Sequence, residues 1–117
     1  MKRILLAGAT GYLGQFVLKE LLHRGFPVRA LVRDADKIRV DDYQDLEVCE
    51  AELTDRQSLS GCCATMDIVI STVGITRQKD GLSYMDVDYQ ANVNLLEESQ
   101  SAGVNKFIYV SALNADK

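Results

Sequence analysis

Three glycines fall within seven positions near the start of the chain, where an apolar run gives way to a helical pattern. Gly8, Gly11 and Gly14 follow the apolar residues 4–7 in the segment AGATGYLG. Glycine costs backbone entropy, so such a cluster marks a place where a side chain would collide with a turn, a ligand or a neighbouring strand. The alternative interpretation is a loop that needs glycines only in order to turn. The elements that flank the motif decide between these interpretations.

Periodicity predicts alternating strands and helices. Helical spacing follows the glycines from Tyr12 to Gly25, and a longer helix carries apolar residues at 87–96 and ends at Gly103. Short helices are expected after Asp34 and after Asp55, and a polar loop at 77–83. The apolar runs typical of buried strands are 2–7, 28–32, 46–49, 67–71 and 107–110. This alternation predicts a Rossmann-type doubly wound parallel sheet with right-handed crossovers and strand order 3-2-1-4-5.

Between a strand and a helix, the glycine motif favours a dinucleotide site. Gly8 would permit the tight turn, Gly11 would let the backbone approach a pyrophosphate, and Gly14 would let the helix pack closely on the sheet. The helix would point its free N–H groups and positive dipole end at the phosphates. A Walker loop is a poor alternative, because Gln15 and Phe16 stand where Lys and Ser or Thr are needed.

A basic residue ends the second strand, where an NAD site normally places a carboxylate. Arg33 lies about 19 residues after Gly14, and Lys37 follows one helical turn later. A guanidinium suits the 2′-phosphate of NADP, because its planar fork can bind two oxygens. Asp34 keeps NAD possible, and a solvated pair of Arg33 and Asp34 at the surface is the alternative. We expect NADP(H) to be preferred over NAD(H).

Composition and charge argue against several other classes of protein. The 117 residues suffice for one domain, and the net charge of −4 argues against nucleic-acid binding through a general basic surface. No apolar run approaches the roughly 20 residues that cross a bilayer. The three cysteines form no Cys-x-x-Cys pair and there is one histidine, so no metal site is expected. With no targeting segment, we expect a cytoplasmic protein in which Cys62 and Cys63 are semi-buried at a helix end rather than a redox pair.

Longer segments resemble a known group of proteins. AGATGYLG, LVRD, ELTD, STVG and DYQANVNLLEESQSAGVNKFIYVS together resemble the NAD(P)-binding part of atypical short-chain dehydrogenases/reductases, with the NmrA-like branch nearest. The resemblance covers essentially the whole chain. It implies that residues 1–117 are an NAD(P)-binding Rossmann domain, the N-terminal part of a longer protein. In agreement, the sequence stops seven residues after the fifth predicted strand, at 107–110, with no sixth strand.

The resemblance also assigns cofactor-binding residues position by position. Asp88 departs from it, because many extended members carry asparagine there. The matching residues are Gly8, Thr10, Gly11, Tyr12, Leu13 and Gly14 in the phosphate loop, Arg33 and Lys37 at the 2′-phosphate, Glu52 and Leu53 beside the adenine, and Thr72, Val73 and Gly74 on the ribose and nicotinamide side.

The catalytic residues of this group are a Ser or Thr, a Tyr acting as general acid or base, and a Lys four positions after the Tyr. None of the five tyrosines here is followed by such a lysine. Ser111 is the candidate serine, although the position most often used falls at Ala112. We therefore expect the NADP(H)-binding domain of a reductase-like or epimerase-like enzyme, whose Tyr–Lys pair and small-molecule substrate pocket lie beyond residue 117. The alternative is an NADP-sensing regulator or assembly factor that binds without turnover.

Overall fold

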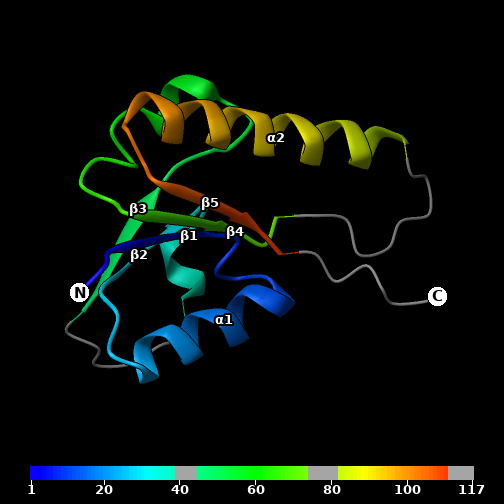
Figure 1. The fold of residues 1–117 in the computed structure, drawn as a ribbon. Coiled ribbons are helices and arrows are strands. Elements are labelled where there is room, and N and C mark those ends of the chain that lie inside the picture. Colours follow the sequence, from blue (N-terminus) through cyan, green and yellow to red (C-terminus); the bar gives the residue numbers. More distant parts are fainter. Residues whose placement is uncertain (39–44, 74–81, 111–117) are drawn as a thin grey trace.

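The structure is a computed structural model that describes residues 1–38, 45–73 and 82–110, without the side chains of Lys37 and of residues 82–88. Strands and helices alternate along the chain (Figure 1). The elements are β1 (Ile4–Ala7), α1 (Tyr12–His23), β2 (Val28–Val32), the 3-10 helix η1 (Ala35–Lys37), β3 (Leu46–Glu50), the 3-10 helix η2 (Arg56–Leu59), β4 (Ile68–Ser71), α2 (Leu82–Ser101) and β5 (Lys106–Tyr109).

The five strands form one parallel sheet in the order β3-β2-β1-β4-β5, which confirms the predicted order. Central β1 pairs with β2 and β4, so that Leu6 lies between Ala30 and Ile70. The chain first builds outward from β1 to β3 and then returns to the other side of β1 with β4. The loops leaving β1 and β4 therefore diverge at the carboxyl edge, which is where such sheets bind ligands.

Helices cover both faces of the sheet, with α1 on one face and α2 and η2 on the other (Figure 1). Side chains alternate along a strand, so β1 contributes to both cores. The core on the α2 face contains Leu5, Ala7, Leu31, Leu59, Cys62, Cys63, Met66, Val69 and Leu95. The core on the α1 face contains Leu6, Ala9, Leu18, Leu22, Val28, Ala30 and Val32. Burial on two faces explains the continuous apolar runs of the central strands.

Helix ends follow local signals. After α1, Gly25 has φ +87°, and the N–H groups of Gly25 and Phe26 donate to Leu22 O at 3.0 Å and Leu21 O at 3.1 Å. This pair of bonds closes the helix at the predicted glycine. The start of α2 differs from the prediction, because Leu82 and Ser83, expected in a polar loop, are helical. The helix start was missed because the sequence has a glycine before Leu82, and glycine is a weaker N-cap signal than Asp or Asn.

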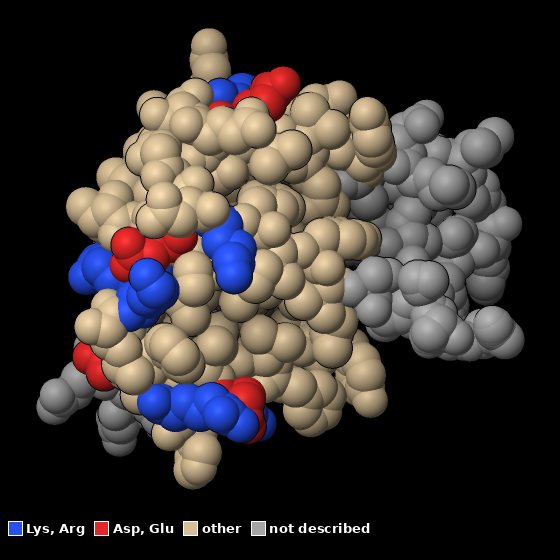
Figure 2. Space-filling view, in the orientation of Figure 1, with Lys and Arg blue, Asp and Glu red and all other residues tan. Residues whose placement is uncertain are grey.

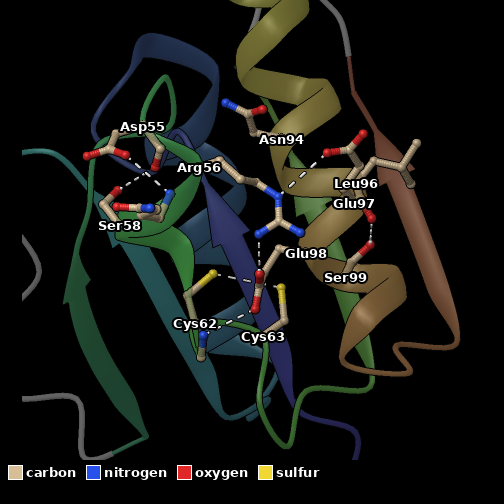
Figure 3. Close-up of polar contacts among 12 residues, drawn as sticks. Asp55, Arg56, Ser58, Cys62, Cys63, Asn94, Leu96, Glu97, Glu98 and Ser99 are labelled. Atoms are coloured by element: carbon tan, nitrogen blue, oxygen red, sulfur yellow. Dashed lines mark hydrogen bonds and ion pairs between the residues drawn. The ribbon is translucent and has the colours of Figure 1, made fainter.

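A polar cluster anchors α2 to the segment around η2 (Figure 3). Arg56 Nη1 donates to Glu98 Oε1 at 2.6 Å, and the N–H of Gly61 donates to Glu98 Oε2 at 3.1 Å. Arg56 also pairs with Glu97 at 3.6 Å. Cys62 and Cys63, expected to be semi-buried, lie fully buried below this cluster with their sulfurs 3.8 Å apart. Both thiols are therefore part of the core between η2 and α2.

The surface mixes charges of opposite sign. On the face shown in Figure 2, Lys and Arg side chains lie beside Asp and Glu side chains. Ion pairs join Arg24 to Glu20 at 2.5 Å and Arg29 to Glu47 at 3.1 Å. Over residues 1–38, 45–73 and 82–110, no helix has the length and apolarity that a membrane crossing requires. In the same residues, no three His, Cys, Asp or Glu side chains come together to hold a metal ion.

Candidate functional site

A cleft of about 200 Å³ lies at the carboxyl edge of the sheet, beside the glycine loop. Its walls come from the glycine loop, the ends of β2 and β3, the segment after β4 and one residue of α2. Six residues predicted from the sequence line it, namely Gly8, Thr10, Arg33, Glu52, Leu53 and Val73. Leu31, Val32, Ala51, Thr54 and Ala91 complete the lining. Residues that are 83 positions apart in the chain thus meet around one cleft.

Gly8 makes the turn out of β1, and Thr72 holds that turn. The φ of Gly8 is +88°, and a Cβ there would collide with Thr72 Oγ1. The Thr72 hydroxyl lies 3.1 Å from Ala7 O and 3.2 Å from Gly8 O, to which it can donate. Thr72 was expected on the ribose side, and its hydroxyl binds the glycine turn. The predicted strand order was a signal for this contact, because it places the ends of β1 and β4 side by side.

Gly14 is required by the same turn. A Cβ on Gly14 would collide with the carbonyl oxygen of Gly8 and lie 2.6 Å from its carbonyl carbon. Gly14 was expected to let α1 pack closely on the sheet, and the nearest described atoms to such a Cβ belong to the turn directly after β1, with Thr72 Oγ1 at 3.0 Å. This contact sets the start of α1 directly over Gly8.

Gly11 is different, because the described chain itself does not require glycine there. Its φ of −77° suits any residue, and a Cβ would lie 3.5 Å from its nearest neighbour, Gly8 O. The missing side chain leaves space beside the first turn of α1. That space suits a ligand that approaches the backbone.

The first turn of α1 offers donors to an anion. Gly11 is the N-cap and supplies no side-chain cap, and the first turn carries no acidic residue. The N–H groups of Tyr12, Leu13 and Gly14 belong to the turn whose donors have no acceptor within the helix. The Tyr12 side chain is 80% exposed and lies edge-on to Phe16, with ring centroids 5.4 Å apart. Tyr12 and Leu13 thus bring backbone donors to the site, which fits a diphosphate.

The β2 end of the cleft carries a basic side chain. Arg33 is 79% exposed, and its Nε lies 3.9 Å from Glu52 Oε1, too far for a hydrogen bond. The neighbouring Asp34 caps η1, where its Oδ1 accepts the N–H of Asp36 at 3.0 Å. Glu50 on β3 accepts the N–H of Ala35 at 2.7 Å and so holds the same loop. Lys37 lies in η1, and its side chain is outside the described part.

Two asparagines that the sequence analysis did not single out bind the loops of the cleft. Asn94 Nδ2 donates to Leu53 O at 2.8 Å, and Asn92 Nδ2 donates to Val73 O at 2.9 Å. The sequence did contain a signal for these two asparagines, because both are polar residues close to Leu95 on the buried stripe of a helix. Gly74 and Ser111 lie outside the described residues, as does the side chain of Asp88.

A doubly wound parallel sheet with a glycine turn, an uncapped helix start and a cleft at the strand switch defines a dinucleotide-binding Rossmann domain. The family model described as NAD(P)H-binding matches residues 8–117. The chain therefore belongs to the NAD(P)H-binding family, and the predicted resemblance and fold are confirmed.

Similar proteins include both enzymes and an assembly factor. The chain is 29% identical, over 97% of its length, to divinyl chlorophyllide a 8-vinyl-reductase of Arabidopsis thaliana and to the photosystem II assembly factor Ycf39 of Synechocystis. It spans 30% and 34% of these curated relatives. A putative epimerase from Bacteroides thetaiotaomicron is 30% identical, with a TM-score of 0.74 over 92% of this chain and 46% of that one.

Proposed function

We propose that this chain binds NADP(H) in preference to NAD(H) and forms the cofactor-binding part of a reductase-like or epimerase-like enzyme. One observation carries the preference. Arg33 is exposed at the cleft, whereas the carboxylate of Asp34, which could hold the ribose hydroxyls of NAD, caps η1. An exposed guanidinium attracts the 2′-phosphate, and an Asp committed to a cap competes poorly for the 2′-hydroxyl.

The proposed binding mode follows the cleft. The pyrophosphate lies at the backbone of residues 11–13, where the space beside Gly11 and the donors of α1 meet. The adenine lies beside Glu52 and Leu53, and the nicotinamide half extends toward Val73 and Gly74. When bound, NADPH supplies the hydride for a reduction. The residues of this chain bind it and orient it.

Titration of both cofactors against the wild type and Arg33→Ala, at one fixed salt concentration, tests the preference. A charge-assisted hydrogen bond contributes about 1.5–3 kcal/mol, so the preference for NADP(H) should fall by about tenfold or more in the variant. Raising the salt should weaken NADP(H) binding more than NAD(H) binding. Arg24→Ala is the matched control, because Arg24 is exposed directly after α1, at its C-cap, and pairs with Glu20.

Equal affinities in the wild type, or an Arg33→Ala variant that keeps the full preference, would show that Arg33 is only a surface charge. The same result for Arg24→Ala and Arg33→Ala would point to a general charge effect. Equal wild-type affinities would refute the preference for NADP(H), the other two results would refute only the role of Arg33, and membership of the NAD(P)H-binding family stands in every case.

The similarity to an assembly factor supports a second candidate, an NADP-sensing regulator that binds without turnover. The 117 residues contain no Tyr-x-x-x-Lys, and the candidate serine, Ser111, has no catalytic partner among them. We expect the purified chain to bind NADPH without oxidising it. Steady NADPH oxidation with a small carbonyl compound would show that this chain is catalytic by itself. A Tyr-x-x-x-Lys in the rest of the reading frame would favour the enzyme over the regulator.

A further inference from the structure

Two amide side chains of α2 connect the opposite walls of the cleft. Asn94 binds the carbonyl of Leu53, which follows β3, and Asn92 binds the carbonyl of Val73, which follows β4. Strands β2 and β1 lie between β3 and β4 in the sheet, so the two loops have no direct strand pairing. Both Leu53 and Val73 line the cleft. The helix therefore joins two walls that the sheet keeps apart.

Each amide is fixed by a second hydrogen bond. Gln90 Nε2 donates to Asn94 Oδ1 at 2.8 Å, and the hydroxyl of Ser71 donates to Asn92 Oδ1 at 2.6 Å. Ser71 Oγ in turn accepts the N–H of Val73 at 3.2 Å. These bonds set which end of each amide donates to the loop carbonyl. Asn94 is 5% exposed and Ser71 is fully buried, so water competes little for these bonds.

The helix touches the cleft between the two amides. Ala91, which lines the cleft, is one residue before Asn92 and three before Asn94. At about 100° per residue, the Ala91 side chain lies between those of Asn92 and Asn94 on the helix surface. A small residue thus faces the cleft, and the longer amides reach past it to either wall.

We propose that Asn92 and Asn94 are positioning residues, which hold the Leu53 wall and the Val73 wall at the separation that a bound dinucleotide requires. The proposal rests on the proposed function, in which the two halves of the cofactor lie along these two walls. Neither asparagine needs to touch the cofactor. Loss of either amide frees one loop, and binding must then order that loop again.

A comparison of two ligands separates positioning from general stability. NADP(H) spans both walls, whereas adenosine 2′,5′-bisphosphate, its adenosine half, reaches only the Leu53 wall. Asn92→Leu should weaken NADP(H) binding about tenfold and change binding of the bisphosphate by less than about twofold. Asn94→Leu should weaken binding of both ligands about tenfold, because it frees the wall that both contact.

Glu98→Gln is the matched control. Glu98 lies one turn after Asn94 on α2 and is similarly buried, at 8% exposed, but it binds Arg56 and Gly61, which do not line the cleft (Figure 3). This variant should lower the stability of the fold and leave both affinities within about twofold, measured where all variants are folded. If a leucine variant does not fold, Asn92→Ser and Asn94→Ser replace the pair, because serine keeps a polar group that is too short to reach the loop.

The outcomes are distinct. Wild-type protein that binds neither ligand would overturn the proposed function itself. Wild-type protein that binds both, with asparagine variants that match Glu98→Gln, would overturn only the positioning role. Equal losses for the two ligands in Asn92→Leu would also overturn it, because a loosened fold rather than the Val73 wall would then explain the loss.

Discussion

The three glycines of the AGATGYLG segment have three different reasons to be glycine. Gly8 has a positive φ and meets Thr72, and Gly14 meets the carbonyl of Gly8. Both are required by contacts inside the chain. Gly11 has an ordinary φ and room for a Cβ among the described residues, and we propose that a ligand is the reason for glycine there. Substitution by alanine can therefore separate folding from binding at neighbouring positions of one loop.

We expect Gly14→Ala to destabilise the fold by about 1–3 kcal/mol, as overpacking does, although alanine is the better helix former. Gly11→Ala should cost less than about 1 kcal/mol of stability, since alanine is only a poorer N-cap. Its dinucleotide affinity should fall more than about tenfold, because a methyl group would fill the approach of the phosphates. Urea denaturation and cofactor titration of both variants measure the two effects. An unchanged affinity in Gly11→Ala would place the phosphates elsewhere.

At the scale of elements, α2 is held by the Arg56–Glu98 pair as well as by its apolar stripe. Glu98 is 11% exposed at its side chain and Arg56 38%, so water screens this pair only in part. Arg24, directly after α1, and Glu20, on α1, are 66% and 58% exposed at their side chains. We expect Arg56→Met to cost about 1–2 kcal/mol, because it leaves a buried carboxylate without its partner. Arg24→Met should cost less than about 0.5 kcal/mol. Thermal or urea unfolding gives both values, and equal costs would contradict an anchoring role for Arg56.

Elements and their order followed from the sequence, because buried strands and amphipathic helices leave clear apolar patterns. Arg33 could be assigned to the cleft for the same reason, since it follows a recognisable strand, whereas Glu52, Leu53 and Val73 were assigned through the resemblance to a known family. Bonds from side chains to loop carbonyls leave no such pattern. The contacts of Asn94 with Leu53, 41 positions away, depend on how α2 lies across the sheet. How α2 lies across the sheet is decided by packing, and the apolar pattern of the sequence does not predict it.

For the whole molecule, buried thiols link stability to alkaline pH. Burial raises the pKa of Cys49 above the ordinary value of 9.0, and the hydrogen bond between Cys62 and Cys63 raises the pKa of Cys62 while it lowers the pKa of Cys63. Above that pH the unfolded chain loses the protons of Cys49 and Cys62 while the folded chain keeps them, so these two thiols lower the free energy of unfolding as pH rises, and Cys63 acts in the opposite direction. The slope is at most about 1.4 kcal/mol per pH unit for each thiol.

Urea unfolding between pH 8 and 10 tests this dependence. Cys49→Ala should show a shallower decline than the wild type, because one of the responsible thiols is gone and the Cys62–Cys63 pair is left intact. Ser99→Ala, a buried substitution without a thiol, should lower stability at every pH and leave the slope unchanged. A Cys49→Ala variant with the wild-type slope would mean that this thiol ionises as readily in the folded protein as in the unfolded one.

The bond from Thr72 to Ala7 joins residues 65 positions apart, and it shapes the wall of the cleft. No short segment can reproduce that cleft. A dinucleotide therefore binds the folded sheet and finds no equivalent site on the unfolded chain. By mass action, cofactor at 100 times its dissociation constant adds about 2.7 kcal/mol to the free energy of unfolding. The fraction of unfolded chain, which is the form that a protease cuts, would then fall about a hundredfold. We therefore expect bound cofactor to protect this chain from proteolysis.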